Sequence, residues 1–159
     1  MSRGTFANIR LRNLLLDDVK PCNLISRQTL ATLQVTTEPL PDDLVVGSGL
    51  EGATCDYNTR YGATVSTSVV TNNGIDHWTD ASYDVKVIER PRIQGYRTIQ
   101  VQHTGESSGP HEMCTRYVDV ADDQSLRAIS GTNDPDDPPT CDVARQFADA
   151  AITSLANQV

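Results

Sequence analysis

The chain has 159 residues, enough for one compact domain, and its 21 acidic residues outnumber its 13 basic ones for a net charge of −8. This balance excludes a dedicated nucleic-acid binder as the first interpretation, because phosphate backbones are held by clustered Lys and Arg. Hydrophobic residues make up 38% of the chain and aromatic residues 5%, so we expect a lean, mostly aliphatic core. No stretch approaches the roughly 18 apolar residues of a membrane-spanning helix.

The first 53 residues contain one expected helix between two irregular regions. We interpret residues 1–18 as an N-terminal tail or arm, in which residues 8–16 form either a short edge strand or a segment laid across the surface. A single domain then covers residues 19–159. A short helix is predicted from Ser26, a suitable N-cap, to about Val35. Residues 36–53 are rich in Gly, Pro and acidic side chains, which predicts a long irregular loop.

Alternating residues predict strands through the middle of the chain. The expected strands cover residues 54–59, 63–71, 84–88, 97–103, 113–120 and 125–130. The last two form a hairpin, in which Cys114 has the same parity as Val118 and Val120 and therefore faces the core. Between the second and third strands, Ile75 and Trp78 are three residues apart, which predicts a short helical turn.

The C-terminal segment carries the clearest pattern, a helix from Cys141 to Ala156 with Thr140 as its cap. Its apolar positions are Val143, Ala144, Phe147, Ala148, Ala151, Ile152, Leu155 and Ala156. This stripe buries one face of the helix. The element order predicts an α+β fold, an antiparallel β-sheet with the short N-terminal helix and the C-terminal helix packed on one face.

Four cysteines, Cys22, Cys55, Cys114 and Cys141, are spread along the chain. None forms a C-x-x-C pair, and an even number at wide spacing predicts two disulfides in an oxidising compartment. Four cysteines allow three connectivities, which the sequence does not distinguish. Proximity along the chain favours Cys22–Cys55 and Cys114–Cys141, and the alternative is four reduced, buried cysteines.

Five short sequence blocks, four of which contain a cysteine, follow one another along the chain. They are Pro21-Cys22-Asn23-Leu24-Ile25-Ser26, Thr54-Cys55-Asp56-Tyr57, Gly95-Tyr96-Arg97, Met113-Cys114 through Tyr117-Val118-Asp119-Val120 to Leu126, and Cys141-Asp142-Val143-Ala144. In this order they resemble a family of actinobacterial cell-envelope lipoproteins of unknown function, whose motifs are PC-x-L-[LI]-[ST], C-x-[WY], a Gly-aromatic pair, C-x-x-x-V-D-V and C-[DE]-x-A. The resemblance covers the chain from about residue 19 to its C-terminus.

The resemblance implies an exported, lipid-anchored envelope protein with two disulfides and no assigned activity. The family begins with a signal peptide and a lipobox cysteine, and this chain has neither. We therefore expect a trimmed form of an exported precursor, which touches the membrane only through an N-terminal lipid anchor missing from the chain.

Few residues point to chemistry. A possible ligand cleft involves Trp78, His103 and His111, because His103 ends a strand and His111 follows in the next loop; a core position for Trp78 and surface positions for the histidines are the alternative. The chain has no G-x-S-x-G or S-x-x-K motif and no metal-ligand spacing, so we predict no catalytic residue, metal or cofactor.

We interpret the chain as a non-catalytic, extracytoplasmic ligand-binding or protein-interaction module. We expect a monomer whose partner is a small ligand or an envelope protein, with cationic or neutral partners favoured by the acidic balance. Two alternatives remain: an envelope hydrolase with His77, His103 or His111 as general base, and an accessory structural subunit.

Overall fold

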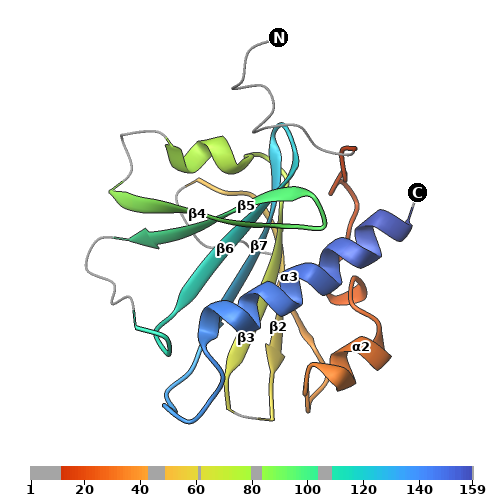
Figure 1. Ribbon diagram of the computed structural model, residues 1–159. Helices are drawn as coiled ribbons and strands as arrows, with labels where there is room; N and C mark the ends of the chain where they lie inside the picture. The colour runs from red at the N-terminus through yellow and green to blue at the C-terminus, as the bar shows by residue number, and fades with distance from the viewer. Residues whose placement is uncertain (1–11, 43–48, 61, 80–83, 104–108, 159) are drawn as a thin grey trace.

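A computed structural model describes residues 12–42, 49–60, 62–79, 84–103 and 109–158. In these ranges seven strands form one antiparallel sheet in the order β1-β2-β3-β7-β6-β5-β4. The strands are β1 (Leu40–Asp42), β2 (Gly52–Asn58), β3 (Thr64–Val70), β4 (Val85–Ile93), β5 (Tyr96–His103), β6 (Cys114–Ala121) and β7 (Gln124–Gly131). The sheet is strongly twisted, so that β4 and β5 run across the direction of β2 and β3 (Figure 1).

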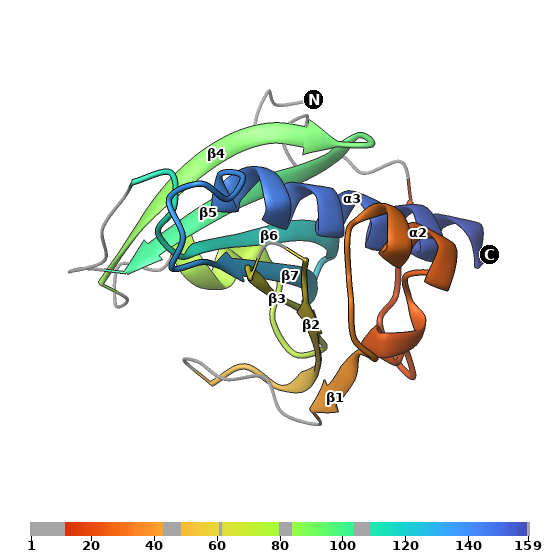
Figure 2. The same ribbon diagram turned by 90° about the horizontal axis from the view of Figure 1, so that it is seen from below.

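Both α-helices of the described residues lie on the same face of the sheet. Helix α3 (Thr140–Asn157) crosses this face diagonally, and α2 (Arg27–Thr32) lies beside it (Figures 1 and 2). The described residues also form two short 3-10 helices, η1 (Pro21–Asn23) and η2 (Ile75–Thr79). The predicted α+β architecture, with a short N-terminal helix and a C-terminal helix on one face, is therefore confirmed.

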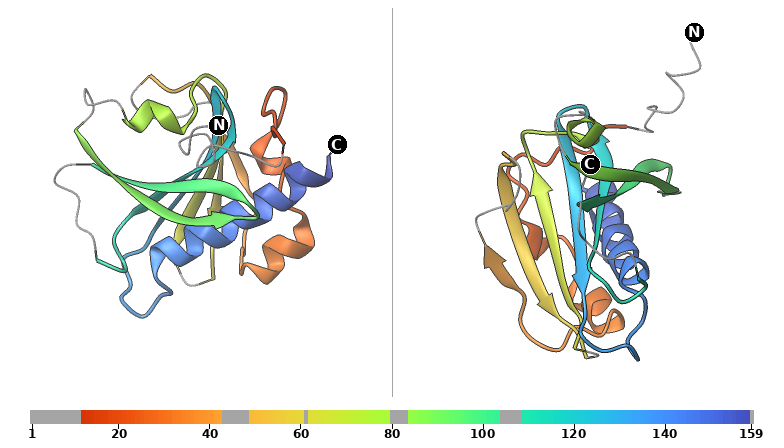
Figure 3. Two further views of the ribbon diagram at one scale, coloured as in Figure 1. Left: turned by 45° about the horizontal axis from the view of Figure 1, so that its top comes forward. Right: turned by 90° about the vertical axis from the view of Figure 1, so that its left-hand side faces the viewer.

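The main core lies between the sheet and α3, which lies against one face of the sheet in the right-hand view of Figure 3. Phe147 is 1% exposed and packs on Tyr57 of β2, with ring centroids 5.3 Å apart. Val118 and Val120 belong to the same core, so the parity predicted for β6 is correct. The residues of the predicted α3 stripe from Val143 to Leu155 are buried.

A second apolar cluster lies on the opposite face of the sheet. Trp78 of η2 is 3% exposed and packs there with Tyr117 of β6 and Ile99 of β5. Its other buried members are Leu50, Val70, Ile75 and Val101. Trp78 therefore lies in a core, which was the alternative to a place in a ligand cleft. A tryptophan buried among apolar side chains stabilises the fold.

Both disulfides join the cysteines as proximity favoured. Cys22–Cys55 ties η1 to β2 with Cα atoms 5.0 Å apart, and Cys114–Cys141 ties β6 to the first turn of α3 with Cα atoms 5.2 Å apart. The remaining connectivities and the free-thiol alternative are excluded in the structure.

Four local expectations differ from the structure. Strand β1 lies inside the predicted loop 36–53, and α2 ends at Thr32 instead of Val35. Strand β4 continues to Ile93 through Pro91, and the N-cap position of α3 is Pro139. Thr140 instead uses its hydroxyl to hold the carbonyls of Pro110, at 3.3 Å, and of Glu112.

Residues 12–16 pack against the end of the sheet and the end of α3. Leu14 and Leu16 are buried, and the Leu14 N–H donates to the Val120 carbonyl at 2.8 Å. The Arg12 guanidinium donates to the Ala156 carbonyl in the last turn of α3. The division into an arm over residues 1–18 and a domain from residue 19 stays a prediction, and residues 1–11 lie outside the described ranges.

Candidate functional site: an arginine-lined pocket

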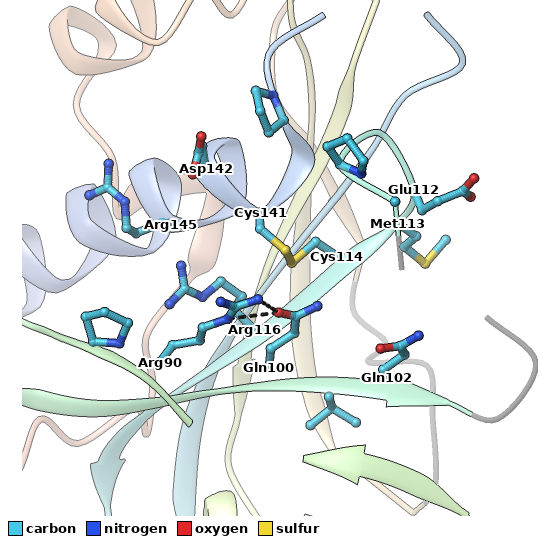
Figure 4. A pocket seen from close by; sticks show the side chains of 15 residues that line it. Arg90, Gln100, Gln102, Glu112, Met113, Cys114, Arg116, Cys141, Asp142 and Arg145 are labelled. Carbon is cyan, nitrogen blue, oxygen red and sulfur yellow. Dashed lines mark hydrogen bonds between the residues drawn. A yellow bond between two sulfur atoms is a disulfide. The ribbon is translucent and has the colours of Figure 1, made fainter. Parts of the chain in front are cut away.

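A pocket of about 490 Å³ lies between the start of α3 and strands β4, β5 and β6. In Figure 4, Asp142 and Arg145 project from the helix on one side, while Arg90, Gln100 and Arg116 come from the strands on the other. Five charged side chains line it, namely Arg90, Glu112, Arg116, Asp142 and Arg145. Three of the five are arginines, although the whole chain is acidic.

The helix side of the pocket is fixed to the sheet by covalent and polar contacts. The Cys114–Cys141 disulfide joins β6 to the first turn of α3, and both cysteines line the pocket. The Thr140 hydroxyl bonds the carbonyls of Pro110 and Glu112 just before β6. These contacts hold the helix start at a set distance above the strands, so the pocket is formed without a ligand.

The strand side is ordered by side-chain hydrogen bonds across three strands. Arg90 Nε on β4 donates to Gln100 Oε1 on β5 at 2.9 Å, and its Nη2 donates to the same oxygen. Arg116 Nη2 on β6 donates to Thr98 Oγ1 on β5 at 3.2 Å. Thr98 in turn donates to the Pro91 carbonyl at 3.1 Å, which ties β5 to β4. The positions of two of the three arginines are thus set by neutral partners.

Arg116 is a buried cation. It lies on the helix-covered face of β6 between Cys114 and Val118 and is 4% exposed. Its Nε is buried without a hydrogen-bond partner. Burial, followed by repulsion from Arg90 and Arg145, lowers the pKa of Arg116 to about 10, while the charge of Asp142 opposes that shift. Arg116 therefore remains charged at neutral pH in an environment that disfavours the charge.

The residues predicted to form a ligand cleft lie elsewhere. Trp78 and His103 are in contact on the opposite face of the sheet, with ring centroids 5.6 Å apart. His111 Nε2 is 2.8 Å from the Asp137 carbonyl oxygen. His111 thus contacts the segment before α3, whereas Trp78 and His103 contact each other, and the cleft stays a prediction.

Histidine chemistry was the basis of the hydrolase alternative. In the part of the chain that the structure describes, His103 contacts the Trp78 ring and His111 contacts a backbone carbonyl; neither bonds a carboxylate or a Ser or Thr hydroxyl there. Across the same described ranges, no group of three or more His, Cys, Asp or Glu side chains is arranged to hold a metal ion.

Comparison with known proteins places the chain in a family. A family model described as "Protein of unknown function (DUF3558)" matches residues 7–154. The chain belongs to this family. No curated protein and no solved structure matches it.

The family membership and the two disulfides together describe a domain of unknown function stabilised for an oxidising, non-cytoplasmic compartment. Among the described residues, none of the helices has the length and hydropathy needed to cross a membrane.

The pocket arginines were missed at the level of sequence. One signal was present, because Arg116 occupies a core parity between Cys114 and Val118, where a charged residue is unusual. The other two arginines carry no such signal, since Arg90 lies on an edge strand and Arg145 on a helix about 30 residues further along the chain from Arg116.

Proposed function

We propose that this domain is a non-catalytic ligand-binding module of a bacterial cell envelope, carried as a lipoprotein, and that the pocket between α3 and strands β4–β6 is its binding site. The two disulfides support an extracytoplasmic location, because such bonds persist in oxidising compartments. The sequence blocks that resemble envelope lipoproteins support the anchor.

The preformed pocket carries the proposal. A concave site of about 490 Å³ has the size of a small-molecule pocket, and several polar side chains converge in it. The disulfide at its wall and the hydrogen bonds at its floor reduce the ordering that a ligand would have to impose.

The separation of the exposed apolar residues favours ligand binding over the role of an accessory subunit. Among the described residues, the large exposed hydrophobic side chains are Leu15, Leu40 and Met113. They belong to the N-terminal segment, to β1 and to the approach to β6, which are three separate elements. Single exposed apolar residues are ordinary, whereas a contiguous patch marks a protein interface.

The test is native mass spectrometry of the protein recovered from the envelope of its own cell. We expect a small molecule bound at one per chain in the wild type and lost in Gln102→Trp, which places an indole in the pocket. Thr64→Trp, at an exposed strand position away from the pocket, is the matched control and keeps the ligand. An unliganded wild-type mass, or equal retention in Gln102→Trp, contradicts the proposal.

The location is tested separately on intact cells that express the full-length precursor. Labelling of surface lysines by a membrane-impermeant reagent, together with recovery of the protein in the membrane fraction, is the expected result. Recovery of unlabelled protein in the cytoplasm with four free thiols contradicts it.

A further inference from the structure

Three of the 13 basic residues of this acidic chain line one pocket. Arg90, Arg116 and Arg145 come from β4, β6 and α3 and line the same cavity. Arg90 and Arg145 are close enough to Arg116 to disfavour its charge. Folding thus brings together three like charges from separate parts of the chain.

Of the three arginines, Arg116 is the one whose position is hardest to explain by a structural role. It is 4% exposed, yet within the described residues its side chain forms one hydrogen bond, to the neutral Thr98 hydroxyl, and no ion pair. Its Nε proton is buried and unbonded. Buried charges in proteins are ordinarily paired or fully hydrogen-bonded, and an unpaired one carries a large desolvation cost.

The acidic side chains of the pocket do not supply the missing partner. Asp142 is the acidic group whose charge acts on Arg116, but it is exposed on the first turn of α3 and forms no ion pair with it. Glu112 is exposed at the pocket rim. The Arg116 guanidinium therefore has donors beyond the one bonded to Thr98, and Figure 4 shows its side chain among the pocket-lining residues of the strands.

We infer that the pocket binds an oxyanion, a phosphate or carboxylate group of the ligand, through the guanidinium groups of Arg116, Arg145 and Arg90. This inference rests on the proposed function, since it assigns a chemistry to the same pocket. The planar guanidinium fork matches the spacing of carboxylate and phosphate oxygens, and such charge-assisted hydrogen bonds are short and strong.

The oxyanion is one group of a larger ligand. Pockets of roughly 300–1,000 Å³ enclose whole small molecules, and this pocket falls in that range. Beyond the arginines it is lined by Gln100 and Gln102 and by the exposed apolar side chain of Met113. The anion therefore orients the ligand, and the remaining lining contacts its uncharged part.

The experiment is calorimetric titration of the intact, disulfide-bonded chain with sodium phosphate and, separately, sodium malonate, at pH 7 and constant ionic strength set with sodium chloride. We expect saturable binding of at least one of the two anions. Tighter binding of phosphate identifies a ligand that bears a phosphate group. Tighter binding of malonate identifies a ligand that bears a carboxylate.

Two variants and a control locate the binding. Arg116→Met and Arg145→Met are each expected to weaken binding by about tenfold or more, as for the loss of a hydrogen bond to a charged group. Arg145 is exposed, so its variant tests the inference even if Arg116→Met does not fold. Arg27→Met removes an exposed arginine on α2 outside this pocket and is expected to bind as the wild type.

The outcomes separate this inference from the proposed function. Absence of saturable binding to both anions, or equal binding by the wild type, Arg116→Met and Arg145→Met, overturns the inference. A neutral or cationic native ligand that Gln102→Trp displaces also overturns it while leaving the proposed function intact. Arginine-dependent anion binding without any retained native ligand supports the inference and contradicts the proposed function.

Discussion

Cys114 and Cys141 form a disulfide whose two ends both line the arginine pocket, one on β6 and the other on the first turn of α3. The bond therefore fixes the distance between the floor of the pocket and its helical side. The Cys22–Cys55 bond, in contrast, joins η1 to β2, three strands away from β6 in the sheet. The two bonds have similar sequence separations of 27 and 33 residues, so they form a matched pair for experiment.

The double variant Cys114→Ala/Cys141→Ala is expected to lose about 2–4 kcal/mol of unfolding free energy and also to weaken anion binding, because the start of α3 is no longer held against β6. Cys22→Ala/Cys55→Ala is expected to lose a similar amount of stability while its anion affinity is unchanged. Urea denaturation and calorimetric titration measure the two effects. Equal anion affinity in both double variants contradicts the role given to the Cys114–Cys141 bond.

Phe147→Ala is expected to lower the unfolding free energy by about 3–5 kcal/mol, because the deleted ring leaves a cavity beneath α3. Phe147 is 1% exposed and packs on Tyr57 in the main core. Phe147→Leu keeps most of the volume and is expected to cost less than about 1.5 kcal/mol. Chemical denaturation measures the unfolding free energy of both variants. If Phe147→Ala loses no more unfolding free energy than Phe147→Leu, the packing of Phe147 described above is contradicted.

The parts of the fold that the sequence predicted are those set by local periodicity. The α3 stripe follows a 3.6-residue period and the parity of Cys114 follows the two-residue period of a strand, and both place the side chain on a definite face. Both patterns are consistent with the Cys114–Cys141 bond, which joins the core face of β6 to the first turn of α3. Neither depends on knowing which strands are neighbours in the sheet.

The missed parts depend on partners distant in the sequence. Strand β1 has three residues, and its pairing of Leu40 with Asp56 leaves no periodic signal of its own. The predicted strand stops before Pro91, but in the structure Pro91 lies in the register shift between Arg90 and Ile93 of an edge strand, where proline is tolerated. The hairpin therefore extends beyond the predicted residues 84–88.

The same limit applies to the candidate site. The net charge of −8 favoured a cationic or neutral partner, whereas the pocket gathers Arg90, Arg116 and Arg145. Net charge sums the whole surface, while a binding site responds to the charges within a few ångströms of it. Only the topology, which places β4, β5 and β6 side by side under α3, brings these arginines together.

Alkaline unfolding is expected to depend on Tyr117. Burial raises the pKa of Tyr117 above its ordinary value of 10.0, although the positive charge of Arg127 and hydrogen bonds with Arg127 and Trp78 oppose the shift. As the pH rises above 10, the unfolded chain loses the phenolic proton while the folded chain retains it, so stability falls. Tyr117→Phe is expected to show a shallower fall in unfolding free energy above pH 10, measured by urea denaturation at a series of pH values. Parallel curves for the wild type and the variant contradict the assignment.

Arg116→Met is expected to raise the unfolding free energy in anion-free buffer by about 1–4 kcal/mol, because an unbranched apolar side chain fills the same buried space without an unpaired charge. Arg27→Met, which removes an exposed arginine bonded to Glu38 at 3.3 Å, is expected to change stability by less than about 1 kcal/mol.

Added phosphate or malonate, whichever binds, is expected to stabilise the wild type but not Arg116→Met, since a ligand stabilises only the protein that binds it. The difference in unfolding free energy between Arg116→Met and the wild type therefore becomes smaller when the anion is present. Urea denaturation with and without the anion measures both effects. If Arg116→Met is less stable than the wild type in anion-free buffer, the Arg116 side chain stabilises the fold, and its buried charge does not serve ligand binding.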